Sequence, residues 1–363
     1  MMAGRPDGAL PESFQMREQP KKTPEREAYY RRIGEHNLAP LWEVLKTIQA
    51  EEPHPPETAV LWRYDDIHQM LMDAAHLIST QEANRRVLIL ENPALRGQTR
   101  ATHSLYAGLQ LVMPGETAPS HRHSQAAIRF IVEGEGAYTS VNGERTNMRE
   151  GDFVVTPAWS WHDHGNPSQK PMVWMDGLDF PIVGLLNCGF FEDYREDAFP
   201  LTRPENDSQA RYSAGMLPVG YREQPLNTPL VNYPYARARE ALKQLEAAGP
   251  IDPCHGVKMR YVNPATGGYA LATIGTFMQV LPAGFSGRPY RSTDAAVYSV
   301  VEGSGRTLVA DRSLEWSKRD VFVVPSWSWH YHEAFEESVI FSFSDRPVHE
   351  TLGLFREQRG EGA

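Results

Sequence analysis

Three histidines stand in a pattern that can hold a metal ion. His121 and His123 flank Arg122 at the start of an expected strand, and His162 lies in a later one. Side chains two positions apart on a strand share a face, so His121 and His123 can reach one cation, and a later strand can add His162. Three neutral imidazoles leave coordination positions open, and they suit Zn, Ni, Cu and Fe alike. The alternative is a surface pair at HRH and a hydrogen-bonded core residue at His162.

The composition limits the class of protein. A chain of 363 residues with 41% hydrophobic residues can bury the cores of two domains. Asp and Glu outnumber Lys and Arg 46 to 36, and a net charge of −10 argues against nucleic acid or an anionic membrane as a partner. No secretion signal or membrane-spanning apolar run is recognisable, so we expect a cytoplasmic protein. Cys188 and Cys254 lie outside any CxxC pattern and are interpreted as core thiols.

An internal repeat predicts the architecture. Residues 131–136 read IVEGEG and residues 300–305 read VVEGSG, while residues 157–164 read PAWSWHDH and residues 325–332 read PSWSWHYH. Short β-branched and aromatic runs surround both copies, and Gly, Pro and Asn separate them, which is typical of antiparallel barrels or sandwiches. The pair Asn142-Gly143 predicts a two-residue hairpin turn.

The repeat also divides the chain into four parts. We expect an N-terminal arm over 1–69, a first barrel with the metal site over 70–190, a linker with a helix over 191–252, and a second barrel over 253–363. Helical periodicity over 24–50, interrupted by Pro40, and over 236–248 places helices in the arm and in the linker. The fold class is therefore all-β, with two tandem barrels.

The second half lacks the complete histidine set. Applying the repeat, Tyr290 and Ser292 replace His121 and His123, and only His330 and His332 remain. We therefore expect a degenerate second site and one metal ion per subunit.

The stretches PGETAPSHRHSQAAIRFIVEGEG and GDFVVTPAWSWHDHG resemble the two cupin motifs, in which an HxH pair and a later histidine bind the metal. A glutamate that commonly serves as a fourth ligand is replaced here by the run from Ala126 to Arg129. Its loss leaves a more positive, more open site, and Arg129 offers a charged fork suited to a carboxylate.

Nearly the whole chain resembles the gentisate 1,2-dioxygenase family of bicupins, which includes salicylate and 1-hydroxy-2-naphthoate dioxygenases. The resemblance rests on NRRVLILENPAL, LYAGLQL, the two cupin motifs, MVWMDGLDFP and MRYVNPATGG. It implies a cytoplasmic homotetramer that uses Fe(II) and O2 to open an aromatic ring bearing an adjacent carboxylate and hydroxyl. For gentisate, the implied product is maleylpyruvate.

The resemblance also implies roles for individual residues. The iron ligands fall on His121, His123 and His162, and the residues implied as catalytic or substrate-binding are Arg85, Arg129, His164, Tyr106, Gly108, Gln110 and Asp176. Arg86 could take part of the role of Arg85, and His164 could instead be a surface residue. Packing and a structural hydrogen bond are the alternatives for Tyr106 and Asp176.

Three functions remain open at this point: a gentisate dioxygenase, which we favour, a relative that accepts salicylate, substituted salicylates or a hydroxynaphthoate, and a cupin that binds a small molecule without turnover.

Overall fold

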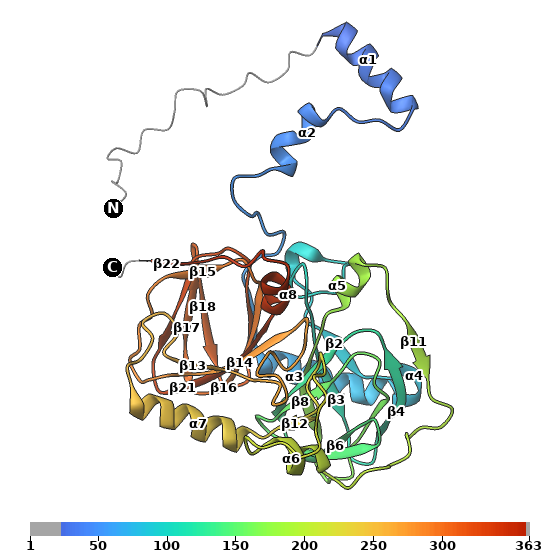
Figure 1. The fold of residues 1–363 in the computed structure, drawn as a ribbon, viewed down its shortest axis with the longest axis vertical. Coiled ribbons are helices and arrows are strands. Elements are labelled where there is room, and N and C mark those ends of the chain that lie inside the picture. Colours follow the sequence, from blue (N-terminus) through green and yellow to red (C-terminus); the bar gives the residue numbers. More distant parts are fainter. Residues whose placement is uncertain (1–22, 361–363) are drawn as a thin grey trace. The chain divides into compact units, whose positions relative to one another are not determined.

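The computed structural model describes residues 23–360. The chain divides into two compact units, Met1–Pro53 and His54–Ala363. In the first unit, helices α1 (Pro24–Glu35) and α2 (Leu41–Ile48) lie on either side of Pro40 (Figure 1). This matches the helical periodicity interrupted by Pro40 in the sequence. Thr23 begins α1 because its hydroxyl accepts the N–H of Arg26 at 3.3 Å.

The first barrel consists of two antiparallel sheets with the strand orders β12-β8-β5-β10-β3-β2 and β11-β4-β9-β6-β7. Its strands are β2 (Val87–Ile89), β3 (Tyr106–Val112), β4 (Thr117–His123), β5 (Ala127–Glu133), β6 (Glu135–Val141), β7 (Glu144–Arg149), β8 (Phe153–Thr156), β9 (His162–Gly165), β10 (Met172–Leu178), β11 (Phe191–Asp193) and β12 (Asn232–Tyr233). Asn142 and Gly143 join β6 to β7 with φ of 47° and 83°, as the predicted hairpin turn requires.

The second barrel repeats this plan, with the strand orders β1-β19-β16-β21-β14-β13 and β18-β17-β20-β15-β22. Its strands are β1 (Val60–Trp62), β13 (Val257–Arg260), β14 (Gly275–Leu281), β15 (Tyr290–Ser292), β16 (Ala296–Glu302), β17 (Ser304–Val309), β18 (Arg312–Ser317), β19 (Val321–Val324), β20 (His330–Ala334), β21 (Ser338–Ser344) and β22 (Glu357–Arg359). These barrels confirm the all-β, two-barrel prediction. Strand β1 precedes the first barrel in sequence but pairs with β19 of the second.

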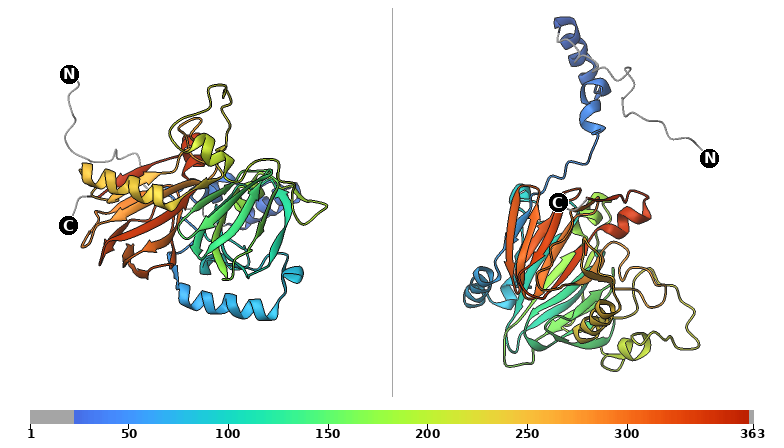
Figure 2. Two further views of the ribbon diagram at one scale, coloured as in Figure 1. Left: turned by 90° about the horizontal axis from the view of Figure 1, so that it is seen from below. Right: turned by 90° about the vertical axis from the view of Figure 1, so that its left-hand side faces the viewer.

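The two barrels share one hydrophobic core. The rings of Phe130 and Phe341 stack at 4.1 Å between centroids, and they belong to a buried cluster with members from both barrels. Gly177 allows the close approach, because a Cβ there would lie 2.7 Å from Phe343 and 2.8 Å from Ile128. The barrels therefore pack directly on each other (Figure 2).

Helices cover the outside of the barrels. Helix α7 (Tyr235–Ala248), expected in the linker, lies along β13 and β14 and ends at Gly249 (Figures 1 and 2). Helix α3 (Tyr64–Leu77) was not predicted, and the expected boundary at residue 69 falls inside it. It buries Tyr64, Ile67 and Leu71, whose three- and four-residue spacing is that of one helical face. The remaining helices are α4 (Thr80–Ala83), η2 (Pro93–Leu95), α5 (Phe180–Leu185), α6 (Asp207–Tyr212) and α8 (Arg346–Thr351).

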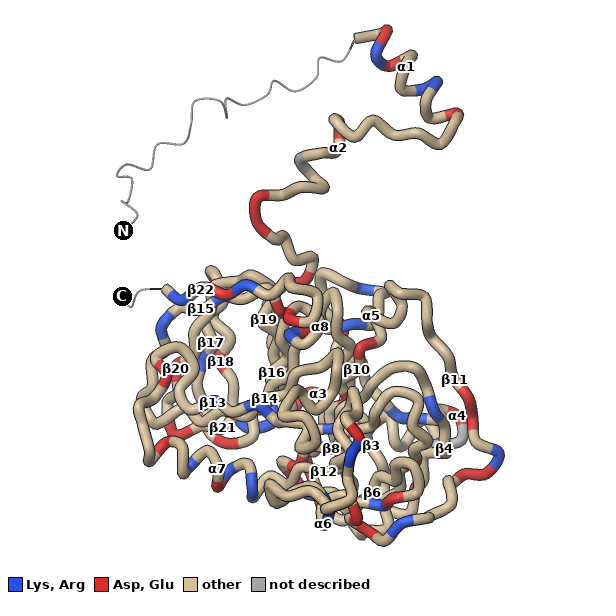
Figure 3. Tube along the Cα trace, viewed as in Figure 1, with Lys and Arg blue, Asp and Glu red and all other residues tan. Residues whose placement is uncertain are grey.

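Within residues 23–360, neither the distribution of charged residues nor the hydropathy of the helices marks a special surface. Figure 3 shows acidic and basic residues interspersed along the barrels. Among the described residues, none of the helices combines the length and the apolar character needed to cross a membrane.

Candidate metal centre

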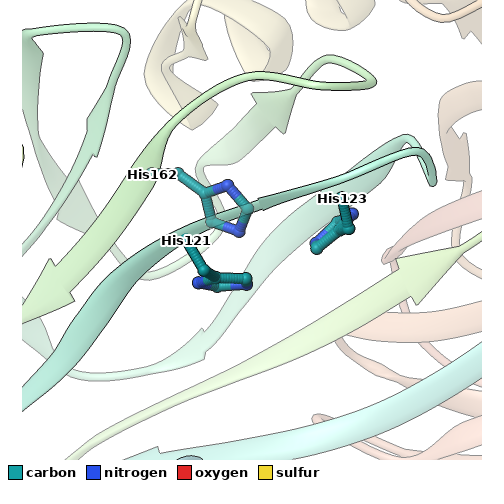
Figure 4. Close-up of side chains that lie close together, drawn as sticks. All are labelled: His121, His123 and His162. Atoms are coloured by element: carbon teal, nitrogen blue, oxygen red, sulfur yellow. The ribbon is translucent and has the colours of Figure 1, made fainter. Parts of the chain in front are cut away.

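The three histidines of the first cupin motif meet inside the first barrel. His121 and His123 end β4, His162 begins β9, and the register places His121 opposite His162. The centroid distances are 4.1 Å from His121 to His162, 5.3 Å from His121 to His123 and 4.9 Å from His123 to His162. Their ligand nitrogens lie within 4.8 Å of one another, and the rings converge on one point (Figure 4).

Main-chain carbonyls orient two of these rings. The Nδ1 of His123 lies 2.9 Å from the carbonyl oxygen of Gln125, and that of His162 lies 2.9 Å from the carbonyl of Ser160. The Nδ1 of His121 is 3.3 Å from the carbonyl of Pro119, but its closer neighbour is the Nη2 of Arg85, which can only donate. At His123 and His162, a proton on Nδ1 leaves the lone pair on Nε2 for a metal, which is the usual arrangement around metal-bound imidazole. The donor set therefore fits a divalent metal.

The surroundings also keep these imidazoles neutral. Burial is the largest cause that lowers their pKa, to about 4 for His123, to about 2 for His121 and well below the ordinary value for His162. The positive charge of Arg129 adds to this effect at all three rings, and that of Arg85 adds to it at His121 and His123. A neutral ring is the form that binds a metal.

An open cavity of about 980 Å³ lies in front of the three histidines. The charged residues that line it are Arg85, Arg100, Arg129 and Asp176, three cations against one carboxylate. The remaining polar lining includes Tyr106 and Gln110. Such a cavity is suited to an anionic ligand of the size of an aromatic acid.

Arg85 and Arg86 have different surroundings. Arg85 lines the cavity, where its Nη2 contacts the Nδ1 of His121 and donates to the carbonyl of Pro119 at 2.8 Å. Arg86 instead forms a bidentate ion pair with Glu116, with both N–O distances 2.9 Å. Of the two, Arg85 is therefore the one available to a ligand in the cavity.

Arg129 and Asp176 form a buried pair in the cavity wall. They lie opposite each other on β5 and β10, with the Nε of Arg129 3.3 Å from the Oδ1 of Asp176. Arg129 also donates to the hydroxyl of Thr156 at 2.7 Å, and Trp174 donates to Asp176 at 3.2 Å. Burial raises the pKa of Asp176 to about 6, although the charge of Arg129 lowers it. Asp176 thus holds Arg129 in place through an ion pair.

Strand β3 supplies the other expected substrate residues. Tyr106 and Gln110 line the cavity, whereas Gly108 is not among its lining residues. A Cβ at Gly108 would lie 2.7 Å from the hydroxyl of Tyr106 and 2.7 Å from Val87. Gly108 therefore lets Tyr106 and Val87 approach the strand.

The comparisons with known proteins agree with this site. A cupin-domain model matches residues 108–178, which include all three histidines. The chain is 53% identical over 342 residues to gentisate 1,2 dioxygenase 1 of Aquipseudomonas alcaligenes, covering 94% of this chain and 99% of that one. The chain belongs to the gentisate 1,2-dioxygenase family.

Two further relatives show the breadth of this family. The 5-aminosalicylate 1,2-dioxygenase of a Comamonas species is 37% identical over 354 residues, covering 96% of this chain and 92% of that one. The crystal structure of the salicylate 1,2-dioxygenase of Pseudoaminobacter salicylatoxidans, as an adduct with gentisate, matches with a TM-score of 0.90 and 32% identity, over 96% of this chain and 97% of that one. The predicted family and bicupin fold are confirmed.

His164, which the family resemblance implied as a catalytic group, is buried and does not line the cavity. Its Nδ1 lies 3.0 Å from the hydroxyl of Thr139. The second barrel contains the same pair, with the Nδ1 of His332 2.8 Å from the hydroxyl of Thr307. The recurrence of the pair in a barrel without a three-histidine set favours a structural role, and a catalytic role of His164 stays a prediction.

The second barrel keeps part of the metal-site framework. Tyr290 lies opposite His330, as His121 lies opposite His162, and the Nδ1 of His330 is 3.1 Å from the carbonyl of Ser328. The cavity there is only about 30 Å³, and Tyr298 is among its lining residues. These features support the expectation of a degenerate second site.

Some wall residues were not predicted from the sequence. Phe191 stacks on His121 with centroids 5.5 Å apart, and Phe180 lies 6.5 Å from His123. Residues 98–100 complete the rim of the cavity. All of them lie outside the two cupin motifs, and nothing in their own spacing indicates a site.

Proposed function

We propose that this protein is a gentisate 1,2-dioxygenase. In the proposed reaction, the ring bond between the carboxylate-bearing carbon and the adjacent hydroxyl-bearing carbon breaks, and both atoms of O2 enter the product, maleylpyruvate. The cationic cavity in front of three neutral histidines is the observation that carries the proposal. The 53% identity to a relative named gentisate 1,2 dioxygenase supports gentisate as the substrate.

We further propose that the metal is Fe(II), one ion per subunit, held by His121, His123 and His162. Three imidazoles without a carboxylate leave coordination positions for a bidentate ligand and for O2. When bound, Fe(II) supplies the one-electron chemistry that lets O2 react with a closed-shell aromatic ring.

The residues of the chain bind and orient the substrate. Arg129, held from behind by Asp176 and Thr156, presents a fixed positive charge to the substrate carboxylate. Arg85 adds a second positive charge beside His121 and favours the negative charge that develops on the reacting oxygens. Tyr106 and Gln110 supply polar contacts along the same wall, and Phe180 and Phe191 offer apolar surface to the ring.

A salicylate-type substrate is the second candidate. Gentisate and salicylate share the carboxylate and the neighbouring hydroxyl, so the three histidines and the two arginines serve both equally. The structural similarity to a salicylate 1,2-dioxygenase is the observation in its favour. A hydroxynaphthoate differs by a second ring and needs more of the cavity.

Oxygen consumption tests the proposal. The iron-loaded enzyme is expected to consume O2 with gentisate, and His162→Ala is expected to abolish it. The matched control is His330→Ala, which removes the equivalent histidine of the second barrel and should leave the activity in place. Absence of O2 uptake with any aromatic acid would show a binding protein without turnover.

Ranking kcat/KM for gentisate, salicylate and 1-hydroxy-2-naphthoate tests the substrate. We expect gentisate to be preferred, and a preference of about tenfold or more for salicylate, corresponding to about 1.4 kcal/mol, would overturn the assignment. Activity restored by Zn(II) in the rigorous absence of iron would contradict the choice of metal.

A homotetrameric assembly and a cytoplasmic location complete the proposal. Both rest on the family resemblance, and light scattering of the purified protein tests the first.

A further inference from the structure

A second cluster of histidines and carboxylates lies where the two halves of the chain meet. His103 precedes β3 of the first barrel, whereas Asp345 and His349 belong to the start and body of α8 after the second barrel. One ligand atom from each of these three residues lies within 4.8 Å of the others. None of the three lines the cavity of the three-histidine centre.

The distances inside the cluster are close to those between ligands of one cation. The Oδ2 of Asp345 lies 3.2 Å from the Nε2 of His349 and 3.8 Å from the Nε2 of His103. The longer of these distances exceeds a hydrogen bond. Ligand atoms about 2.0–2.2 Å from a tetrahedral zinc ion are separated by roughly 3.3–3.6 Å. Small side-chain rotations therefore suffice to place a cation among the three atoms.

Neighbouring groups already orient two of these ligands. Both oxygens of the Glu57 carboxylate lie within 3.2 Å of the Nδ1 of His103, which directs Nε2 toward Asp345. A carboxylate behind a histidine is the usual support for a metal-bound imidazole. Asp345 uses its Oδ1 to accept the N–H of Ala295 at 3.0 Å, which leaves Oδ2 for the cluster.

The internal repeat shows that this cluster is a departure from the common plan. Asp179 before α5 occupies the place of Asp345 before α8, and it likewise accepts a main-chain N–H, that of Ala126. Four residues after these aspartates stand Val183 in the first copy and His349 in the second. Three residues before the first long strand stand His103 in the first copy and Ala272 in the second.

Both substitutions in the repeat thus bring a histidine to the same aspartate. The other oxygen of Asp179 accepts only the hydroxyl of Thr273 at 2.5 Å, a neutral contact. In the second copy, the corresponding oxygen faces two imidazoles. Barrel packing does not require histidine at these two positions, because the other copy of the repeat fills them with Ala and Val.

Two buried carboxylates lie beside the two imidazoles of the cluster. The carboxylates of Glu57 and Asp345 are 0% and 2% exposed, and buried carboxylates are costly unless they are compensated. Arg100, the neighbouring base, donates to the carbonyl of His103 and to the side chain of Gln98 rather than to these carboxylates. The side chain of His103 is 35% exposed, which gives a cation access from solvent.

We propose that His103, Asp345 and His349 bind a divalent transition-metal cation of the zinc class, and that Glu57 positions His103. Two imidazoles and carboxylate oxygen are ligands that zinc accepts in tetrahedral sites, with solvent as the fourth ligand. A bound cation would tie the loop before β3 of the first barrel to α8 of the second.

Metal analysis of the iron-loaded enzyme tests this site. The untagged protein is dialysed anaerobically against micromolar Zn(II), and the iron and zinc contents are then measured by mass spectrometry. We expect the wild type to keep its iron and to gain one zinc per chain, and to unfold at a higher temperature with zinc than without it.

The repeat supplies the matched variant. His103→Ala together with His349→Val installs the residues that the other copy carries at these positions, and we expect it to keep its iron but to lose the added zinc. Glu57→Gln is expected to weaken zinc binding by about 10-fold to 100-fold. Retained iron and an unchanged circular dichroism spectrum show that each variant has folded.

Three results would overturn the proposal: no zinc retained by the wild type, equal zinc in the wild type and the double variant, or zinc gained only in exchange for iron. The thermal shift of the wild type with zinc decides the matter even if the double variant does not fold.

Discussion

Replacing Asp176 by asparagine in the metal-free enzyme removes one buried carboxyl group and keeps its shape. Burial raises the pKa of this carboxyl to about 6 from the ordinary value of 3.8, so the folded protein binds its proton more tightly than the unfolded chain does. The stability that this proton contributes is complete below the ordinary value and is lost as the pH rises through about 6. The wild type should therefore lose stability over this interval relative to Asp176→Asn.

The expected size follows from the pKa difference. About two units at 1.36 kcal/mol each give a limit of about 3 kcal/mol, and about 1.4 kcal/mol of it falls between about pH 5 and pH 7.5. Because all other groups are shared, the difference between the two proteins isolates this term.

Urea unfolding of both proteins at several pH values, followed by tryptophan fluorescence and circular dichroism, measures this difference. The free energy of unfolding of the wild type, minus that of the variant, should fall by about 1.4 kcal/mol as the pH rises over that range. A difference that stays constant with pH would show that Asp176 titrates normally. A difference that rises with pH would show that its ion pair with Arg129 outweighs the cost of burial.

Three further changes test the positioning of the site. Arg122 lies between Trp159 and Trp161, 4.5 and 4.4 Å from their ring centroids. Arg122→Ala should therefore cost about 1–2 kcal/mol of stability. It should also weaken metal binding, which a metal titration measures. Arg291→Ala removes the equivalent stack in the second barrel and should cost similar stability without changing metal affinity; an equal loss of affinity in both would contradict the positioning role. Arg129→Gln should lower kcat/KM for gentisate by about 10²–10³, with partial recovery in Arg129→Lys, and steady-state kinetics within threefold of the wild type would argue against its role in binding. Gly177→Ala should destabilise the protein by about 1–3 kcal/mol through overpacking between the barrels, measured by thermal unfolding, and an unchanged midpoint would count against the shared core.

The histidine set could be predicted because its geometry is local. His121 and His123 obey the two-residue period of a strand, and the repeat related His162 to His330, so sequence comparison alone brought the candidates together. The choice between Arg85 and Arg86 could not be made in this way. Both precede the short strand β2, and a shift of one residue in its expected register exchanges the side chain that faces the cavity.

The other omissions have a common physical cause. Phe180, Phe191 and the His103 cluster depend on segments that the fold brings together from distant parts of the chain. Their residue types are ordinary where they stand, so no local period or spacing marks them. Helix α3 did carry a helical pattern, but the barrel was expected to begin within it.

One face of strand β5 lines the cavity and the other packs in the core between the barrels. The first barrel therefore depends on the second for its packing. Arg129 points into the cavity, while Ile128 and Phe130 on either side of it belong to the core shared with Phe341 of the second barrel. The second barrel, which lacks the histidine pair, therefore supports the sheet that carries the site in the first. A shortened gene that encodes only the first copy would leave the back of the site-bearing sheet exposed, and we expect its product to aggregate rather than to work as a smaller enzyme.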